Sequence, residues 1–366
     1  MVVRPQPVGW IRTPALAAPA GDVISDVLVV VPWHRRRILM LLLAVGLAGS
    51  ASAVLATGTA DLNDWLIRAG DALVRLRWPF LAPVLLFAAT HYAASAVGLR
   101  AAAGVPMRFG TTVAVQLAAA AANRLTVAGI GAAAVNTRYL TRSGLRLPAA
   151  LSSMTALGMF GLAAKTLTLL AIVFAGSALG LGDGTTQLTL VGHHLSHMLA
   201  PLERTYVWGP ILGLAAVLTT IFVWRGAHGR HLRRFMEFKH GFWAPVRALL
   251  RDPRRLALLT GASAGTTLML GFAFIACTHV VAGVHPSASL SGLLIAYMLG
   301  GAVGTATPLP GGLGATEAAL TAMLVANHVP ASHALQVVLL FRVVTFWLPA
   351  VIGLLASRQL VRRRVL

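Results

Sequence analysis

Residues 307–317 read Thr-Pro-Leu-Pro-Gly-Gly-Leu-Gly-Ala-Thr-Glu, and this stretch lies inside a long apolar part of the chain. Its two prolines and three glycines prevent a continuous helix. In hydrocarbon an unpaired backbone amide is costly, so a broken segment at membrane depth is stable only where protein encloses it or where it lines a polar cavity. The segment therefore indicates a polar site inside a membrane protein.

The composition supports a membrane protein. Of 366 residues, 57% are hydrophobic and only 11% are charged, and several windows of roughly 20 residues are apolar. The net charge is +20, but the basic residues gather in short segments beside apolar ones, which is typical of cytoplasmic loops rather than of a nucleic-acid-binding surface. The single cysteine, Cys277, excludes an intramolecular disulfide.

We predict an all-α polytopic membrane protein with about six spanning helices, each bounded by charge, proline or glycine. The expected spans are 38–57, 79–99, 149–180, 205–224, 256–282 and 332–356. Residues 1–37 are expected to form a flexible basic cytoplasmic leader, and residues 38–366 a single transmembrane domain. The distribution of lysine and arginine places both termini in the cytoplasm, in a multi-pass protein of the cell membrane.

Two apolar stretches are each interrupted near the middle. Residues 110–136 break at Asn123-Arg124, and residues 290–327 break at 308–314. The basic connections on both sides of the first stretch require it to enter and leave by the cytoplasmic face, as a re-entrant hairpin or as two full spans. The same reasoning puts the second stretch on the outer face. The two halves, about 38–180 and 205–356, then form an inverted repeat, a design typical of transporters.

Glu317 and Arg342 form the strongest candidate pair. They lie on either side of the turn near residue 329, each roughly 16–18 Å below the outer surface at 1.5 Å per helical residue. Charges at that depth indicate mutual pairing, a water-filled cavity, or both. One reading is an ion pair that only fixes helix packing. The other is a head-group or proton site, since Glu317 adjoins the Gly311-Gly312 turn. The exposed N–H groups at the start of the short helix after this turn would suit an anion such as phosphate.

Further candidates lie in the first half. Arg124 is at the break of the first interrupted stretch, where it binds phosphate or reaches the interface from a shallow hairpin. Lys165 is too deep in its helix to reach the cytoplasmic face easily, which favours a cavity-facing role. Asn123, Thr126 and Thr307 are expected to add hydrogen bonds, although small polar residues in membrane helices also serve packing. We predict no metal site and no cofactor.

The motif P-x-P-G-G-x-G-x-x-E, followed by V-P-A and by L-F-R-V-V-T-F-W-L-P, closely resembles the signature of the lysylphosphatidylglycerol synthase transmembrane-region family. This family includes the flippase part of bacterial MprF proteins and the membrane part of an archaeal dolichol-linked glycosyltransferase. The resemblance covers most of the chain from about residue 38. Residues at the family's motif positions are Pro308, Pro310, Gly311, Gly312, Gly314, Glu317 and Arg342. The first half departs from the pattern at Val127-Ala128-Gly129, and at Lys165, where arginine is more usual.

The resemblance implies a lipid translocase that moves a phospholipid or isoprenoid-linked lipid between leaflets, with its head group passing between the two interrupted stretches. The alternative is a non-transporting accessory subunit of a cell-envelope synthesis enzyme. A membrane transferase would need a cluster of acid and base residues at one surface, which the sequence does not offer, so we expect no enzyme activity. The expected partners are a membrane lipid, and an envelope-synthesis enzyme or a second copy of the chain.

Overall fold

The computed structural model describes residues 77–124, 126, 129–178, 189, 243, 245–281, 289–306 and 310–366. All of them belong to one compact unit, Thr59–Leu366. The predicted leader 1–37, the predicted spans 38–57 and 205–224, and the residues Thr307 and Pro308 lie outside the described residues. Every regular element in the described part is helical, so the all-α prediction is confirmed there.

Four helical stretches in the described residues are long and apolar enough to cross a membrane. They are Trp78–Ala103, Leu147–Gly176, Pro253–Val280 and Ala331–Arg362. The first contains α4 (Leu81–Ala103), the second lies in α7 (Leu147–Ala178), and the third is α11 (Pro253–Val280). The fourth joins α14 (Ala331–Arg342), a π-helical turn (Val343–Trp347) and α15 (Leu348–Arg362). These four agree with the predicted spans 79–99, 149–180, 256–282 and 332–356.

Each interrupted stretch forms two short helices that pack against each other. The first gives α5 (Phe109–Arg124) and α6 (Ile130–Arg142), and the second gives α12 (Leu290–Ala306) and α13 (Ala315–Ala326). The α6 helix extends beyond the predicted end at residue 136, so much of the basic connection 138–146 is helical and the turn is confined to 143–146. The α5 helix ends at Arg124, where the sequence predicted the break in the first stretch.

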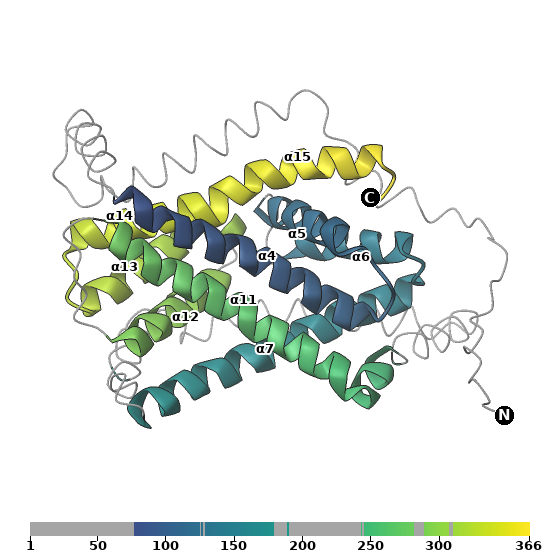
Figure 1. Ribbon diagram of the computed structural model, residues 1–366, viewed down its shortest axis with the longest axis horizontal. Helices are drawn as coiled ribbons and strands as arrows, with labels where there is room; N and C mark the ends of the chain where they lie inside the picture. Colours follow the sequence, from purple (N-terminus) through teal and green to yellow (C-terminus); the bar gives the residue numbers. More distant parts are fainter. Residues whose placement is uncertain are drawn as a thin grey trace, which may run out of the picture. The chain divides into compact units, whose positions relative to one another are not determined.

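The α4 and α11 helices lie side by side along much of their length (Figure 1). Small residues face one another across this pair: Gly98 of α4 lies opposite Ala262 of α11, and Gly265 of α11 lies opposite Ala94 of α4. At one end, Arg255 donates hydrogen bonds to the carbonyl oxygen of Ala101 and ties the start of α11 to the end of α4. This pair is the scaffold against which the other helices pack.

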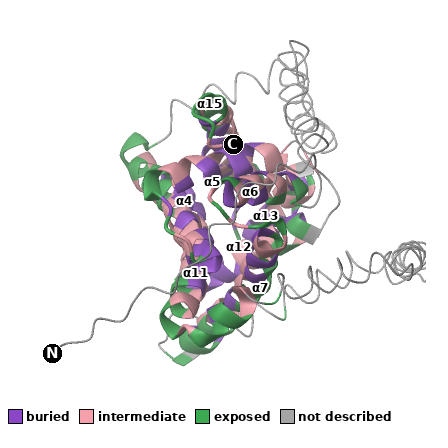
Figure 2. Cartoon of the chain, turned by 90° about the vertical axis from the view of Figure 1, so that its right-hand side faces the viewer, coloured by how far each residue is buried: buried purple, intermediate pink, exposed green. Residues whose placement is uncertain are grey.

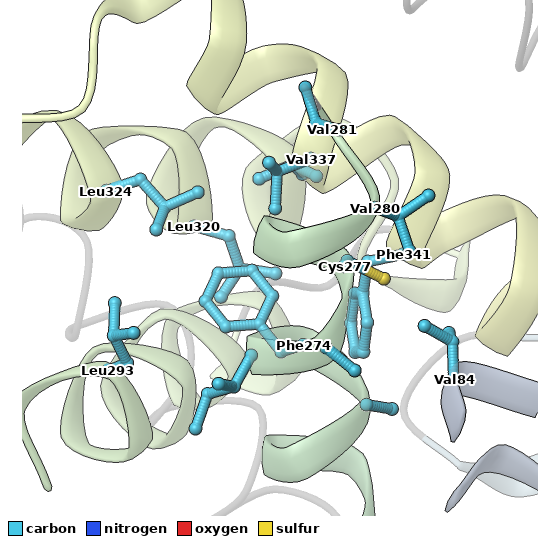
Figure 3. Close-up of a cluster of buried hydrophobic side chains, with 14 of the residues drawn as sticks. Val84, Phe274, Cys277, Val280, Val281, Leu293, Leu320, Leu324, Val337 and Phe341 are labelled. Atoms are coloured by element: carbon cyan, nitrogen blue, oxygen red, sulfur yellow. The ribbon is translucent and has the colours of Figure 1, made fainter. Parts of the chain in front are cut away.

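The apolar core lies between α11, the second interrupted stretch and α14, with a contribution from α4 (Figure 3). Phe274 is fully buried, with its ring edge-on to Phe341 at 5.4 Å and near Tyr297 at 5.9 Å. Leu320 and Leu324 from α13 belong to the same cluster. By contrast, α7 exposes large apolar side chains (Figure 2), including Leu162, Leu167 and Phe174. In a membrane protein such a surface faces lipid.

Candidate functional site

The turn at 310–314 has the backbone conformation that its glycines predict. Gly311 and Gly312 both have left-handed backbone angles, with φ of 61° and 64°, and α13 begins directly afterwards at Ala315. Gly311 also has no room for a side chain, since a methyl group there would lie 2.6 Å from the ring of Phe346. The glycines therefore allow both the reversal of the chain and a close approach to α14–α15.

Glu317 and Arg342 form a buried ion pair across this turn. Arg342 Nε donates to Glu317 Oε1 at 2.6 Å, and the two side chains are only 10% and 15% exposed. The other carboxylate oxygen of Glu317 accepts from the Gly314 N–H at 2.8 Å, which caps the start of α13. Arg342 Nη2 donates to the carbonyl oxygen of Gly311 at 3.2 Å. The pair therefore holds both ends of the turn.

One aromatic ring lies between two guanidinium groups. The guanidinium carbon of Arg342 is 4.1 Å from the ring centre of Phe346, and that of Arg124 is 4.6 Å from the same ring. Such cation–π contacts are strongest where water is excluded. Phe346, which is buried, thus connects the first interrupted stretch with the ion pair of the second.

The two breaks meet at this point. The Cα atom of Arg124 lies 3.8 Å from the position of a methyl group on Gly311. Arg124 Nη2 donates to the carbonyl oxygen of Thr345 at 2.9 Å. Because residue 349 is proline, that carbonyl cannot receive the usual helical bond from the residue four positions later. The π-helical turn Val343–Trp347 lies at the same place, as π-helical turns often do at functional sites.

The turn of the first interrupted stretch is stabilised by a threonine side chain, whereas the turn of the second depends on glycines. Thr126 Oγ1 accepts from the Gly131 N–H at 2.8 Å and donates to the carbonyl oxygen of Ala122 at 3.2 Å. Gly129 has φ of 79° and begins α6. Asn123 points to this turn, with its Oδ1 3.8 Å from the position of a methyl group on Gly129. Gly129 thus has a left-handed conformation, although the sequence before it lacks the Pro-Gly of the second half.

Lys165 lies in α7 and interacts electrostatically with His91 of α4. The positive charges of Lys165 and Arg124 both repel the protonated form of the half-buried imidazole of His91, and Arg124 also repels Arg342. Lys165 is exposed. It lies one turn after Gly161, which faces α11, since a methyl group on Gly161 would be 3.7 Å from Ser263. Lys165 is on the side of α7 opposite Phe174.

Sequence reasoning missed a buried chain of hydrogen bonds in the first half. Ser95 Oγ donates to Gln116 Oε1, and Gln116 Nε2 donates to Asn136 Oδ1, both at 3.0 Å. The Nδ1 atom of His91 donates to the carbonyl oxygen of Thr266 at 3.0 Å. The helical spacing of Thr112, Gln116 and Asn123 along α5 was the signal that could have revealed a polar stripe.

The structure therefore brings Glu317, Arg342 and the glycines 311, 312 and 314 into one cluster with Arg124. Asn123 adjoins this cluster, and Pro310 begins its turn. Lys165 lies in α7 and shares with Arg124 an electrostatic interaction with His91 of α4.

These features define a class of protein: a multi-pass, all-helical membrane protein in which two broken helical stretches meet around buried charges. The family model described as Lysylphosphatidylglycerol synthase TM region matches residues 38–353. The match spans most of the chain, and the protein belongs to this family. A search of curated proteins gave no match.

Proposed function

We propose that the protein is a lipid translocase, which moves a phospholipid or isoprenoid-linked lipid between leaflets without changing its covalent structure. The observation that carries the proposal is the contact of the two breaks at Arg124 and Gly311, beside the buried pair of Glu317 and Arg342. Backbone breaks and charges at membrane depth suit a polar crevice, and a lipid head group needs such a crevice to cross hydrocarbon.

In the proposed membrane arrangement, residues 38–57 and 205–224 add two spans to the four described ones. The α5–α6 and α12–α13 pairs are re-entrant hairpins from opposite faces, and the halves 38–180 and 205–356 are an inverted repeat. Two features support this arrangement: each half has an interrupted stretch of two short packed helices, and the basic residues cluster at alternate connections. Both termini then face the cytoplasm, and the protein resides in the cell membrane.

The charges of the site would replace part of the head group's hydration during its passage. Arg124 and Arg342 supply donors for phosphate oxygens, and the ion pair keeps the carboxylate of Glu317 from repelling them. The sequence has no nucleotide-binding loop, so transport proceeds as scrambling or is coupled to an ion or proton gradient. Glu317 is the candidate proton carrier for the second mode.

The experiment measures movement of fluorescent lipids between the leaflets of proteoliposomes. Glu317→Gln and Arg342→Ala should reduce the rate at least about tenfold, the effect of losing one charge-assisted hydrogen bond. Arg146→Gln is the matched control, because it removes an exposed charge in the turn between α6 and α7. Thermal unfolding in detergent checks that each variant is folded. Unchanged rates in both site variants would reject the site.

The same preparation tests the accessory-subunit alternative. A wild-type protein that moves no lipid, but co-purifies with an enzyme of envelope synthesis and raises that enzyme's stability or activity, would replace the translocase proposal. Self-association of the purified chain is measured alongside, because a second copy is the other partner we propose.

A further inference from the structure

The cations around the breaks outnumber the carboxylates. Among the described residues only Asp252 and Glu317 are acidic. Asp252 caps the start of α11 through the Arg255 N–H, and Glu317 is already engaged by Arg342 and the Gly314 N–H. Neither acidic side chain of the described part forms an ion pair with a cation of the first half.

Arg124 has unused hydrogen-bonding capacity. Its Nη2 reaches the carbonyl oxygen of Thr345, but its Nε is buried and has no hydrogen-bond partner among the described residues. The Oδ1 atom of the preceding Asn123 is likewise buried without a partner in the described part of the chain. A buried donor or acceptor without a partner is costly, and most of all a charged donor such as Arg124 Nε. These two groups are therefore suited to a ligand that brings its own polar atoms.

Lys165 supplies a second cation with access to the outside. It is exposed, it lies one turn after Gly161, which faces Ser263 of α11, and it interacts electrostatically with His91 of α4. One turn further along α7, Thr168 lines a cavity of about 380 Å³ between α7, α11 and α12. The walls of this cavity are mainly apolar and include Leu268 and Leu294. A cation at one end of an apolar groove matches the two parts of a lipid molecule.

We propose that the transported lipid has a head group of net negative charge. Arg124 Nε binds its phosphate, Lys165 adds a second positive charge beside the groove, and one acyl or isoprenoid chain occupies the groove lined by Thr168, Leu268 and Leu294. The phosphate oxygens supply the acceptor that Arg124 Nε lacks and the anion that balances Lys165. A zwitterionic head group brings its own ammonium and leaves this excess of positive charge uncompensated. This inference rests on the proposed function and specifies its substrate class.

The first test compares lipids in proteoliposomes. Wild-type protein should move fluorescent phosphatidylglycerol about tenfold faster than fluorescent phosphatidylcholine, the gain expected of one charge-assisted hydrogen bond. Arg124→Gln and Lys165→Gln should each bring the ratio of the two rates close to one, whereas Arg146→Gln should leave the ratio as in wild type. Lys165 is exposed, so its substitution keeps the test valid if the Arg124 variant does not fold.

Equal rates for the two lipids in wild type, or an unchanged ratio in both variants, would overturn the substrate class and leave the translocase proposal standing. Movement of neither lipid by wild type would instead refute the translocase proposal. A binding measurement then decides the head-group assignment independently of transport.

That measurement follows thermal unfolding of the full chain in detergent with dihexanoyl phosphatidylglycerol, with dihexanoyl phosphatidylcholine or with inorganic phosphate alone. Stabilisation by the anionic lipid that is lost in Lys165→Gln supports the assignment. Equal stabilisation by inorganic phosphate would identify a free-anion site rather than a lipid site, and stabilisation by neither anionic ligand would overturn the proposal.

Discussion

Replacing Gly311 by alanine should destabilise the protein through two separable effects. An alanine with φ near 61° carries a conformational cost of roughly 1–2 kcal/mol. Its methyl group would also lie 2.6 Å from the ring of Phe346, and overpacking of this kind costs about 1–3 kcal/mol. The expected loss in the free energy of unfolding is therefore about 2–5 kcal/mol. The ring cannot yield easily, because it lies between the guanidinium groups of Arg124 and Arg342.

Gly129 provides a matched control within the same chain. It has a similar left-handed conformation, with φ of 79° and ψ of 1°, but the nearest atom to an added methyl group is Asn123 Oδ1 at 3.8 Å. Gly129→Ala should therefore show the conformational cost alone. The assay is unfolding in mixed micelles titrated with sodium dodecyl sulfate.

A double-mutant cycle isolates the contact with the ring. Phe346→Leu should cost less in the Gly311→Ala protein than in wild type, with a coupling of about 1–3 kcal/mol, because the shorter side chain removes the overlap. Equal losses for Gly311→Ala and Gly129→Ala, or a coupling near zero, would refute the reasoning that the turn and the π-helical segment are in tight contact.

Three further substitutions test the packing around the site, each by the same unfolding assay. Gly353→Leu should separate α15 from α5 and prevent stable folding, since even a methyl group there would overlap the carbonyl oxygen of Leu117; a stable variant would contradict this packing. Arg255→Ala should cost about 1.5–3 kcal/mol by freeing the carbonyls that end α4, with Arg255→Lys restoring part of the loss. Gln116→Leu should cost about 1–3 kcal/mol because Asn136 loses its partner, and Gln116→Glu tests whether an acceptor alone suffices; no loss in Gln116→Leu would show that water replaces the bond.

The sequence alone was sufficient for the class of protein. Runs of apolar residues bounded by charge identify membrane helices because the cost of exposing backbone and charge to lipid is large and local, and four predicted spans coincide with helices of the structure. The glycines at 311 and 312 predicted the turn for the same reason, since left-handed backbone angles are a local requirement. Glu317 and Arg342 were identified because charge at membrane depth requires a partner.

The tertiary structure decided which groups meet. Nothing local to Phe346 predicts that its ring lies between Arg124 and Arg342, which come from helices more than 200 positions apart in the sequence. Nor does the sequence reveal that Pro349 leaves the Thr345 carbonyl to Arg124, or that Ser95, Gln116 and Asn136 form one buried chain. Such contacts depend on how helices cross, and crossing is set by the summed packing of many small side chains rather than by any single motif.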